Sequence, residues 1–112
     1  MPDIKSVNNI HFIGVGGISI SALAKLMLKW GKSVSGSDTA FSSNVIELME
    51  KGADIWIGSD PLAIKNTDLA VYSSAIRNDD KELQHCLNNN IPTMERHVFL
   101  GKVAKQFSNT IA

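Results

Sequence analysis

Short apolar runs alternate along this chain with longer segments in which apolar residues recur with helical spacing. The short runs are typical of buried strands, and they cover residues 9–13, 32–37, 54–57, 69–73 and 91–94. The longer segments predict helices at residues 18–30, 43–51, 79–88 and 95–107, with one helical turn at 61–65. Strands separated by helical crossovers form parallel sheets with right-handed connections. The pattern therefore predicts an α/β fold: a Rossmann-like five-stranded parallel sheet, order 3-2-1-4-5, with helices on both faces.

The spacing within each helical segment also predicts which side chains face the core. These are Leu23, Leu26, Met27, Trp30, Val45, Leu48, Met49, Leu83, Cys86, Leu87, Leu100, Val103, Ala104 and Phe107. Asp79, with Glu82 three residues later, resembles a capping box at the start of the third helix. Residues 109–112 resemble the start of a further strand that is cut short, so we expect residues 1–112 to be one domain of a longer protein.

Composition and charge narrow the class of protein. The chain has 112 residues, 44% of them apolar and 20% charged, which is enough for one packed domain. Eleven basic residues balance eleven acidic ones, so no electrostatic attraction to nucleic acid or to a membrane surface is expected. No apolar run is long enough to span a bilayer, and the first residues lack the apolar stretch of a signal peptide. We expect a cytoplasmic protein, in agreement with its single cysteine.

Candidate catalytic and metal-ligating groups are sparse. His11, His85, His97 and Cys86 have no metal-ligand spacing, so no metal site is expected. His11 is expected to be a hydrogen-bonded residue of the core or of a sheet edge rather than a base. No nucleophile, base and acid form a recognisable arrangement, and the ATP-binding pattern G-x-x-x-x-G-K-[ST] does not occur. The residues therefore predict binding, with neither a catalytic residue nor a cofactor in this chain.

A glycine-rich turn between the first strand and the first helix is the leading candidate for a binding site. Gly14 and Gly16 fit the pattern G-x-G-x-x-G, and Ser19 stands where the third glycine would be. A strand, such a turn and a helix together form a phosphate site, because the helix directs unpaired N–H groups and its positive dipole end at the anion. A side chain at Gly16 is expected to intrude on the phosphates or to strain a positive φ. The alternative is a tight turn without a ligand.

Three further places lie beyond the carboxyl ends of predicted strands, where open α/β sheets bind their ligands: Ser37-Asp38, Gly58-Ser59 and the segment from Ser73 to Arg77. Asp38 ends the second strand, in the position where dinucleotide-binding proteins place an acid that holds a ribose hydroxyl. The alternative is a turn or capping aspartate. Ser73, Ser74 and Arg77 follow the fourth strand and suit a sugar or a base edge, although capping and loop hydrogen bonds explain them equally well.

Four ordered motifs together resemble the N-terminal domain of the Mur ligases. They are His11-Phe12-Ile13-Gly14-Val15-Gly16-Gly17-Ile18, then Ser35-Gly36-Ser37-Asp38, then Tyr72-Ser73-Ser74-Ala75-Ile76, then Ile91-Pro92. The resemblance covers nearly the whole chain and is greatest to the family member that adds L-alanine. It implies a three-domain, ATP-dependent ligase of peptidoglycan synthesis, in which this domain binds UDP-N-acetylmuramate. ATP and Mg²⁺ would then bind to the central domain and L-alanine to the C-terminal domain, both outside this chain.

The resemblance also implies roles for particular residues. The backbone of the glycine turn would hold the diphosphate, Ser37 and Asp38 would bind the uridine, and an arginine would follow the Ile-Pro pair. The implied substrate-binding residues are Gly14, Val15, Gly16, Gly17, Ile18, Ser37, Asp38, Ser73, Ser74, Ala75 and Arg96. The chain departs from the family pattern at Ser19, Ile20 and Glu95. Two other functions stay open: a sister ligase that attaches a preformed peptide to UDP-muramate, and a nicotinamide-binding Rossmann module.

Overall fold

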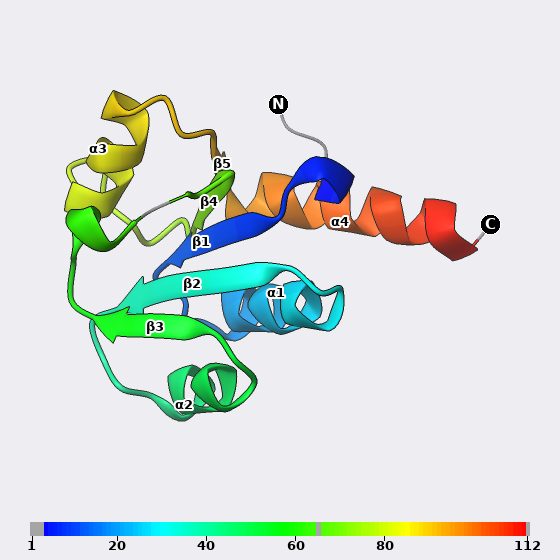
Figure 1. The fold of residues 1–112 in the computed structure, drawn as a ribbon, viewed down its shortest axis with the longest axis horizontal. Helices are drawn as coiled ribbons and strands as arrows, with labels where there is room; N and C mark the ends of the chain where they lie inside the picture. The colour runs from blue at the N-terminus through cyan, green and yellow to red at the C-terminus, as the bar shows by residue number, and fades with distance from the viewer. Residues whose placement is uncertain (1–3, 65, 112) are drawn as a thin grey trace.

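A five-stranded parallel sheet forms the centre of the molecule (Figure 1). The structure is a computed structural model that describes residues 4–64 and 66–111, with residues 107–111 described by their backbone alone. The strands are β1 (Asn9–Ile13), β2 (Ser33–Asp38), β3 (Asp54–Ile57), β4 (Leu69–Tyr72) and β5 (Thr93–Glu95). Their order is β3-β2-β1-β4-β5, and every neighbouring pair is parallel. The predicted fold class and strand order are confirmed.

Helices cover both faces of this sheet. They are α1 (Ile18–Lys29), α2 (Ser43–Glu50), α3 (Lys81–Asn88) and α4 (Arg96–Ile111), with short 3₁₀ turns η1 (Ile4–Ser6) and η2 (Pro61–Ala63). Helices α1, α2 and α4 share one apolar core with the sheet, whereas α3 and the end of η2 pack on its other face. Figure 1 shows α3 on the opposite side of the sheet from α1 and α2. None of the described helices is long and apolar enough to cross a membrane.

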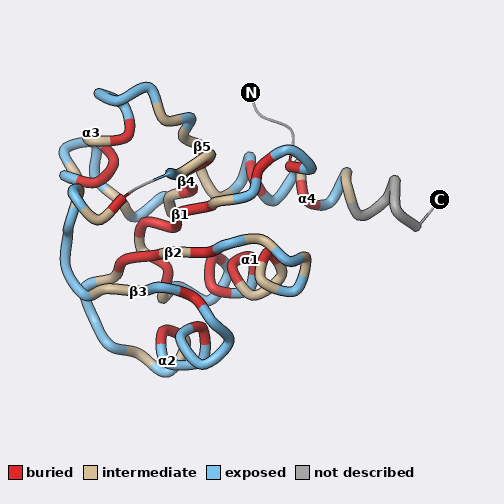
Figure 2. The backbone as a smooth tube through the Cα atoms, in the orientation of Figure 1, coloured by how far each residue is buried: buried red, intermediate tan, exposed pale blue. Residues whose placement is uncertain are grey.

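The main core lies between the sheet and helices α1, α2 and α4. Alternate residues of β1 point to one face, so Ile10 and Phe12 both enter this core and are almost completely buried. The Phe12 ring meets the ring of Phe99 from α4 edge to face, with 6.0 Å between centroids. Figure 2 shows burial concentrated along β1, β2 and the sheet-facing side of α1. The apolar sides of α1, α2 and α4 therefore pack against the same face of the sheet.

The opposite face is unusually polar. Here β1 presents His11, and the neighbouring β2 presents Ser35 and Ser37. The His11 ring is fully buried and stacks on the Trp56 ring of β3, with centroids 5.0 Å apart. His11 is thus a hydrogen-bonded core residue, as predicted. This polar face borders the candidate site, because Ser37 at the carboxyl end of β2 also lines the cleft.

Some inward-facing positions were predicted wrongly. The exposed fractions of Met49, Leu87 and Leu100 are 42%, 51% and 45%, and Ala104 is also exposed. In α4 the core residues are Phe99 and Val103, four positions apart, so their next neighbours in the chain are rotated by one helical step toward solvent. The predicted apolar stripes were too wide because one sheet face cannot cover a full half of a short helix. The side chain of Phe107 lies outside the described residues.

Two boundary predictions are also wrong. The N-cap of α3 is Asp80, whose Oδ1 accepts the N–H groups of Glu82 and Leu83 at 2.9 and 3.0 Å, and not Asp79. The Glu82 side chain is therefore released from any capping box. Residues 109–111 continue α4 instead of starting a strand, and residue 112 lies outside the described part of the chain. A helix satisfies its backbone groups locally, whereas a strand needs a sheet edge beside it.

Candidate functional site

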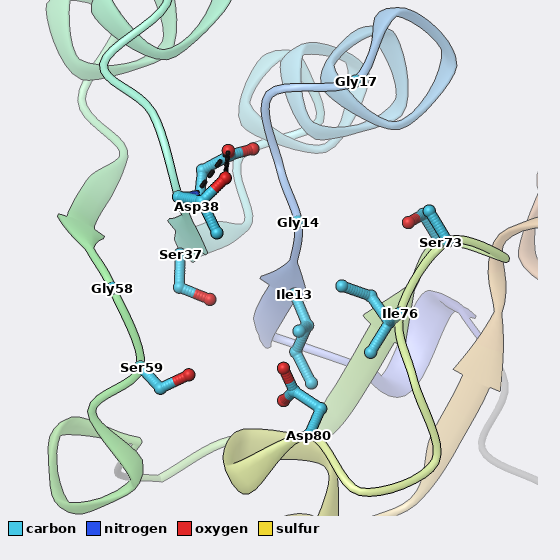
Figure 3. A pocket seen from close by; sticks show the side chains of 12 residues that line it. Ile13, Gly14, Gly17, Ser37, Asp38, Gly58, Ser59, Ser73, Ile76 and Asp80 are labelled. Atoms are coloured by element: carbon cyan, nitrogen blue, oxygen red, sulfur yellow. Dashed lines mark hydrogen bonds between the residues drawn. The ribbon is translucent and has the colours of Figure 1, made fainter.

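A cleft with a volume of about 380 Å³ opens at the carboxyl ends of β1, β2, β3 and β4 (Figure 3). It contains the switch point between β1 and β4, where the chain connections leave the sheet in opposite directions. Its lining residues are Ile13, Gly14, Gly17, Ser37, Asp38, Thr39, Gly58, Ser59, Ser73, Ala75, Ile76 and Asp80. Segments far apart in the sequence thus converge on one hollow, as the topological rule predicts.

The glycine turn is held tightly against the end of β2. The N–H groups of Gly14 and Val15 both donate to the Ser37 carbonyl at 2.9 Å. Gly14 has a φ of 79°, so the positive φ occurs here and not at Gly16 as predicted. The Val15 side chain is fully buried, and a Cβ on Gly36 would lie 3.0 Å from its Cβ. Val15 therefore fixes the turn in the core and can contribute only backbone to a ligand.

Helix α1 begins at this cleft without a side-chain cap. Its N-cap residue, Gly17, makes no capping hydrogen bond, whereas α2 and α3 are capped by the side chains of Ser42 and Asp80. The first N–H groups of a helix need partners outside the helix, and the helix dipole favours an anion there. The Ile18 side chain is 85% exposed, so its contribution to binding is its backbone. This helix end has the chemistry of a phosphate site.

Asp38 links the glycine turn to the loop after β2. Its Oδ2 accepts the N–H of Gly16 at 2.6 Å, and its Oδ1 accepts the N–H groups of Thr39 and Ala40 at 2.7 and 3.2 Å. The turn role and the ligand role considered for Asp38 are therefore compatible, because the same carboxylate also lines the cleft. Asp38 and Asp80 are the charged residues among those lining the cleft. No lysine or arginine is among these lining residues, so the donors that they offer a phosphate are backbone N–H groups and hydroxyls.

The structure brings only some of the predicted site residues together. Gly14, Gly17, Ser37, Asp38, Ser73 and Ala75 line the cleft. Gly16 does not line the cleft itself, but its N–H donates to Asp38, which does. Ser74 is exposed and does not line the cleft. Arg96 lies in a separate hollow between α1 and α4, beside Ser19. Arg77 is exposed and pairs with Asp79 at 3.3 Å.

Sequence reasoning selected Gly58 and Ser59 as a strand end beside the ligand, but it missed Asp80 in the cleft wall. Ser59 follows β3, and Asp80 caps α3, so each approaches the cleft from an element on the polar face of the sheet (Figure 3). Gly58 and Ser59 were predicted from their position at the carboxyl end of a strand. Asp80 could have been found by placing the N-cap directly before the helical pattern instead of one residue earlier.

A buried carboxylate lies beneath the cleft floor. Glu82 of α3 is fully buried, and its Oε1 is 2.9 Å from His11 Nε2 and accepts the Ser37 hydroxyl at 2.5 Å. Its Oε2 accepts the indole N–H of Trp56 at 2.7 Å and the N–H of Asp60 at 2.9 Å. Burial alone would raise the pKa of Glu82, but these hydrogen bonds outweigh it and lower the pKa to about 2. The carboxylate therefore stays ionised at neutral pH.

Asp38→Ala should weaken binding of UDP by about 10- to 150-fold. A charge-assisted hydrogen bond to a ligand contributes roughly 1.5–3 kcal/mol, and each 1.4 kcal/mol is tenfold in affinity. Calorimetry with UDP measures the change. Urea unfolding of both proteins is the control, because the variant also loses the hydrogen bond to Gly16. Unchanged affinity in a stably folded variant would limit Asp38 to its turn role.

The fold and the cleft define a Rossmann-like α/β domain with an uncapped helix N-terminus at its switch point. Residues 9–108 match the sequence profile described as Mur ligase family, catalytic domain. The chain therefore belongs to the Mur ligase family.

Curated relatives and solved structures agree with this assignment. The UDP-N-acetylmuramate–L-alanine ligase of Clostridium tetani is 47% identical over 98 residues, which are 88% of this chain and 22% of that protein. The ligase of the same name from Acetivibrio thermocellus is 39% identical over 110 residues, 98% of this chain and 24% of that protein. The crystal structure of UDP-N-acetylmuramate-alanine ligase MurC from Thermotoga maritima has a TM-score of 0.84 and 26% identity, covering 88% of this chain and 23% of that chain. The present chain thus spans about a quarter of the length of these relatives.

Proposed function

We propose that this chain binds the UDP portion of UDP-N-acetylmuramate, as one domain of a longer ligase that adds L-alanine to that substrate. The observation that carries the proposal is the uncapped N-terminus of α1, which opens on a cleft at the switch point of the sheet. The names of the relatives support the choice of substrate. The resemblance of the four motifs to the Mur ligases points the same way.

The cleft divides into two parts of opposite hydrogen-bonding character. Backbone N–H groups at the start of α1 supply donors and suit the diphosphate. The carboxylates of Asp38 and Asp80, with the hydroxyls of Ser59 and Ser73, surround the remainder and suit a nucleoside. Nucleosides carry hydroxyl and N–H donors, so a nucleoside diphosphate matches both parts at once.

The alternatives have less support. A nicotinamide dinucleotide needs room for a second nucleoside beyond β4, where Ser73, Ala75 and Ile76 form a wall of the cleft. For the sister ligase that attaches a preformed peptide, the structure from Neisseria meningitides has a TM-score of 0.73 at 24% identity over 81% of this chain and 29% of that chain, a likeness of fold alone. The curated relatives reported above carry the name of the L-alanine ligase instead.

ATP and Mg²⁺ belong, in this proposal, to another part of the longer ligase. The sequence contains no G-x-x-x-x-G-K-[ST] loop, and the residues that the structure describes include no group of three metal-ligating side chains. The residues of this chain that the structure describes therefore fit neither ATP nor Mg²⁺.

The 112-residue chain should accordingly fold on its own and hydrolyse no ATP. A coupled phosphate-release assay with and without UDP-N-acetylmuramate measures this. Turnover that copurifies with the chain, and that Gly16→Val removes, would contradict the assignment of ATP chemistry to another domain.

Chemical-shift mapping tests the proposed site directly. Titration of the ¹⁵N-labelled chain with UDP-N-acetylmuramate should shift the amide signals of Gly16 to Ser19, of Ser37 to Thr39 and of Gly58 to Ser59. Amides of Leu100 and Val103, on the α4 side of the separate hollow beside Arg96, should move least. Shifts confined to the α4 side of that hollow, with none at the start of α1, would refute the proposed site.

A further inference from the structure

We propose that Glu82 is a positioning residue of the cleft: its carboxylate turns the hydroxyl hydrogen of Ser37 away from the ligand, so that Ser37 offers the nucleoside only an acceptor. This inference rests on the proposed function and concerns a residue that does not itself line the cleft. Neither the glycine turn nor the proposed phosphate site explains why a carboxylate is buried at this place.

Four groups from four segments surround Glu82: His11 of β1, Ser37 of β2, Trp56 of β3 and the N–H of Asp60. An ionised carboxylate only accepts hydrogen bonds, so each partner must donate. The indole and the backbone N–H can do nothing else. The hydroxyl of Ser37 and the ring of His11 can each donate or accept, and the Glu82 carboxylate fixes both of them as donors.

The consequence for Ser37 is a fixed hydrogen-bonding direction. Its single O–H hydrogen points to Glu82 Oε1, which leaves its lone pairs for any ligand group in the cleft that it lines. Figure 3 shows the Ser37 side chain projecting from the end of β2 into the cleft. Ser37 thereby acts like the carboxylates of Asp38 and Asp80. This wall of the cleft then accepts hydrogen bonds from a ribose hydroxyl or from the N3–H of uracil.

The consequence for His11 is a fixed proton position. Its Nε2 carries a proton, because it donates to Glu82, while its Nδ1 lies 2.8 Å from the Ser35 hydroxyl. The same carboxylate therefore sets the proton positions of both neighbours. His11 does not line the cleft, so its tautomer reports on Glu82 independently of binding.

Glu82→Gln is the sharpest perturbation. Trp56 and the Asp60 N–H can only donate, so the amide oxygen must face them and the amide NH₂ must face Ser37 and His11. The Ser37 hydroxyl is then released to point its hydrogen into the cleft. We expect UDP affinity to fall about tenfold, and Ser37→Ala to cost about the same. The double variant should be no weaker than either single variant, since both remove the same acceptor.

Ligand analogues identify the ligand group whose hydrogen bond Ser37 accepts. The panel is UDP, N3-methyl-UDP, 2′-deoxy-UDP and 3′-deoxy-UDP, measured by calorimetry. One analogue should lose at least fivefold in the parent protein, and that loss should vanish in both Glu82→Gln and Ser37→Ala. Glu47→Gln is the matched control, because Glu47 is an exposed residue of α2 that pairs with Lys25. Additive losses, or analogue losses that persist in Glu82→Gln, would overturn the proposal.

A spectroscopic readout separates this role from a merely structural one. Long-range ¹H–¹⁵N spectra of the parent should show the His11 proton on Nε2, and Glu82→Gln should move it to Nδ1. A parent His11 without a proton on Nε2 would refute the assignment, even if Glu82→Gln failed to fold. Failure of the parent to bind UDP would instead refute the proposed function, and the His11 proton would still decide what Glu82 does to its neighbours.

Discussion

Gly16→Val should leave no detectable binding of UDP-N-acetylmuramate while most of the fold persists. A Cβ at Gly16 would lie 2.5 Å from Asp38 Oδ2 and 3.2 Å from Ser42 Oγ. The Asp38 side chain is flexible enough to move, so the fold survives, but its bond to the Gly16 N–H is lost. The two parts of the cleft then separate, because Asp38 is the side chain that links the turn to the nucleoside wall.

Calorimetry measures the affinity, and far-ultraviolet circular dichroism with urea unfolding measures the fold. The matched control is Gly101→Val, since a Cβ at Gly101 of α4 meets nothing within 4 Å. That variant should bind like the parent. Binding by Gly16→Val within threefold of the parent would show that the glycine turn is purely structural.

Acidification should remove a large share of the stability between about pH 4.5 and pH 2. The pKa of Glu82 is lowered from 4.5 to about 2, so the unfolded chain takes up the proton first as the pH falls. The stabilisation is complete above the unfolded pKa and is lost as the pH falls through the folded one. A shift of this size corresponds to a contribution on the order of 3 kcal/mol, since each unit is 1.36 kcal/mol.

Urea unfolding at pH 7, 4 and 2.5 tests this linkage in the parent and in Glu82→Gln. The parent should lose stability steeply below pH 4.5, and the variant should lose much less because residue 82 no longer titrates. Glu47→Gln is the control; the pKa of Glu47 is also lowered, chiefly by its hydrogen bond to Lys25, but the residue is exposed and contributes little. Parallel curves for the parent and Glu82→Gln would contradict the role given to the buried carboxylate.

The strands and their order could be predicted because they depend on local pattern and on topology rules. The glycine turn was equally accessible, since a strand, Gly14 and the start of α1 are contiguous in the sequence. Asp38 followed from its place at a strand end. In each case the signal lies within a few residues or in a rule that applies to the whole fold class.

The polar cluster around Glu82 could not be predicted from the same pattern. His11 and Glu82 are 71 positions apart, and nothing in either local segment indicates the other. Glu82 itself was assigned to a capping box, because a single sequence does not show whether a carboxylate at a helix start faces the backbone or the core. Arg96 was placed in the site by resemblance alone; it does not line the cleft, and it lies with residues of α1 and α4 in a separate hollow.

The most direct measurement is a calorimetric titration of the 112-residue chain with UDP-N-acetylmuramate and, separately, with NAD and NADP. Both classes of ligand would use the glycine turn and Asp38, so only their relative affinity distinguishes the two functions. The proposal predicts measurable, weak binding of UDP-N-acetylmuramate, suppressed by Gly16→Val, and no detectable binding of either dinucleotide. Tighter binding of NAD than of UDP-N-acetylmuramate would contradict the proposal and favour a nicotinamide-binding module.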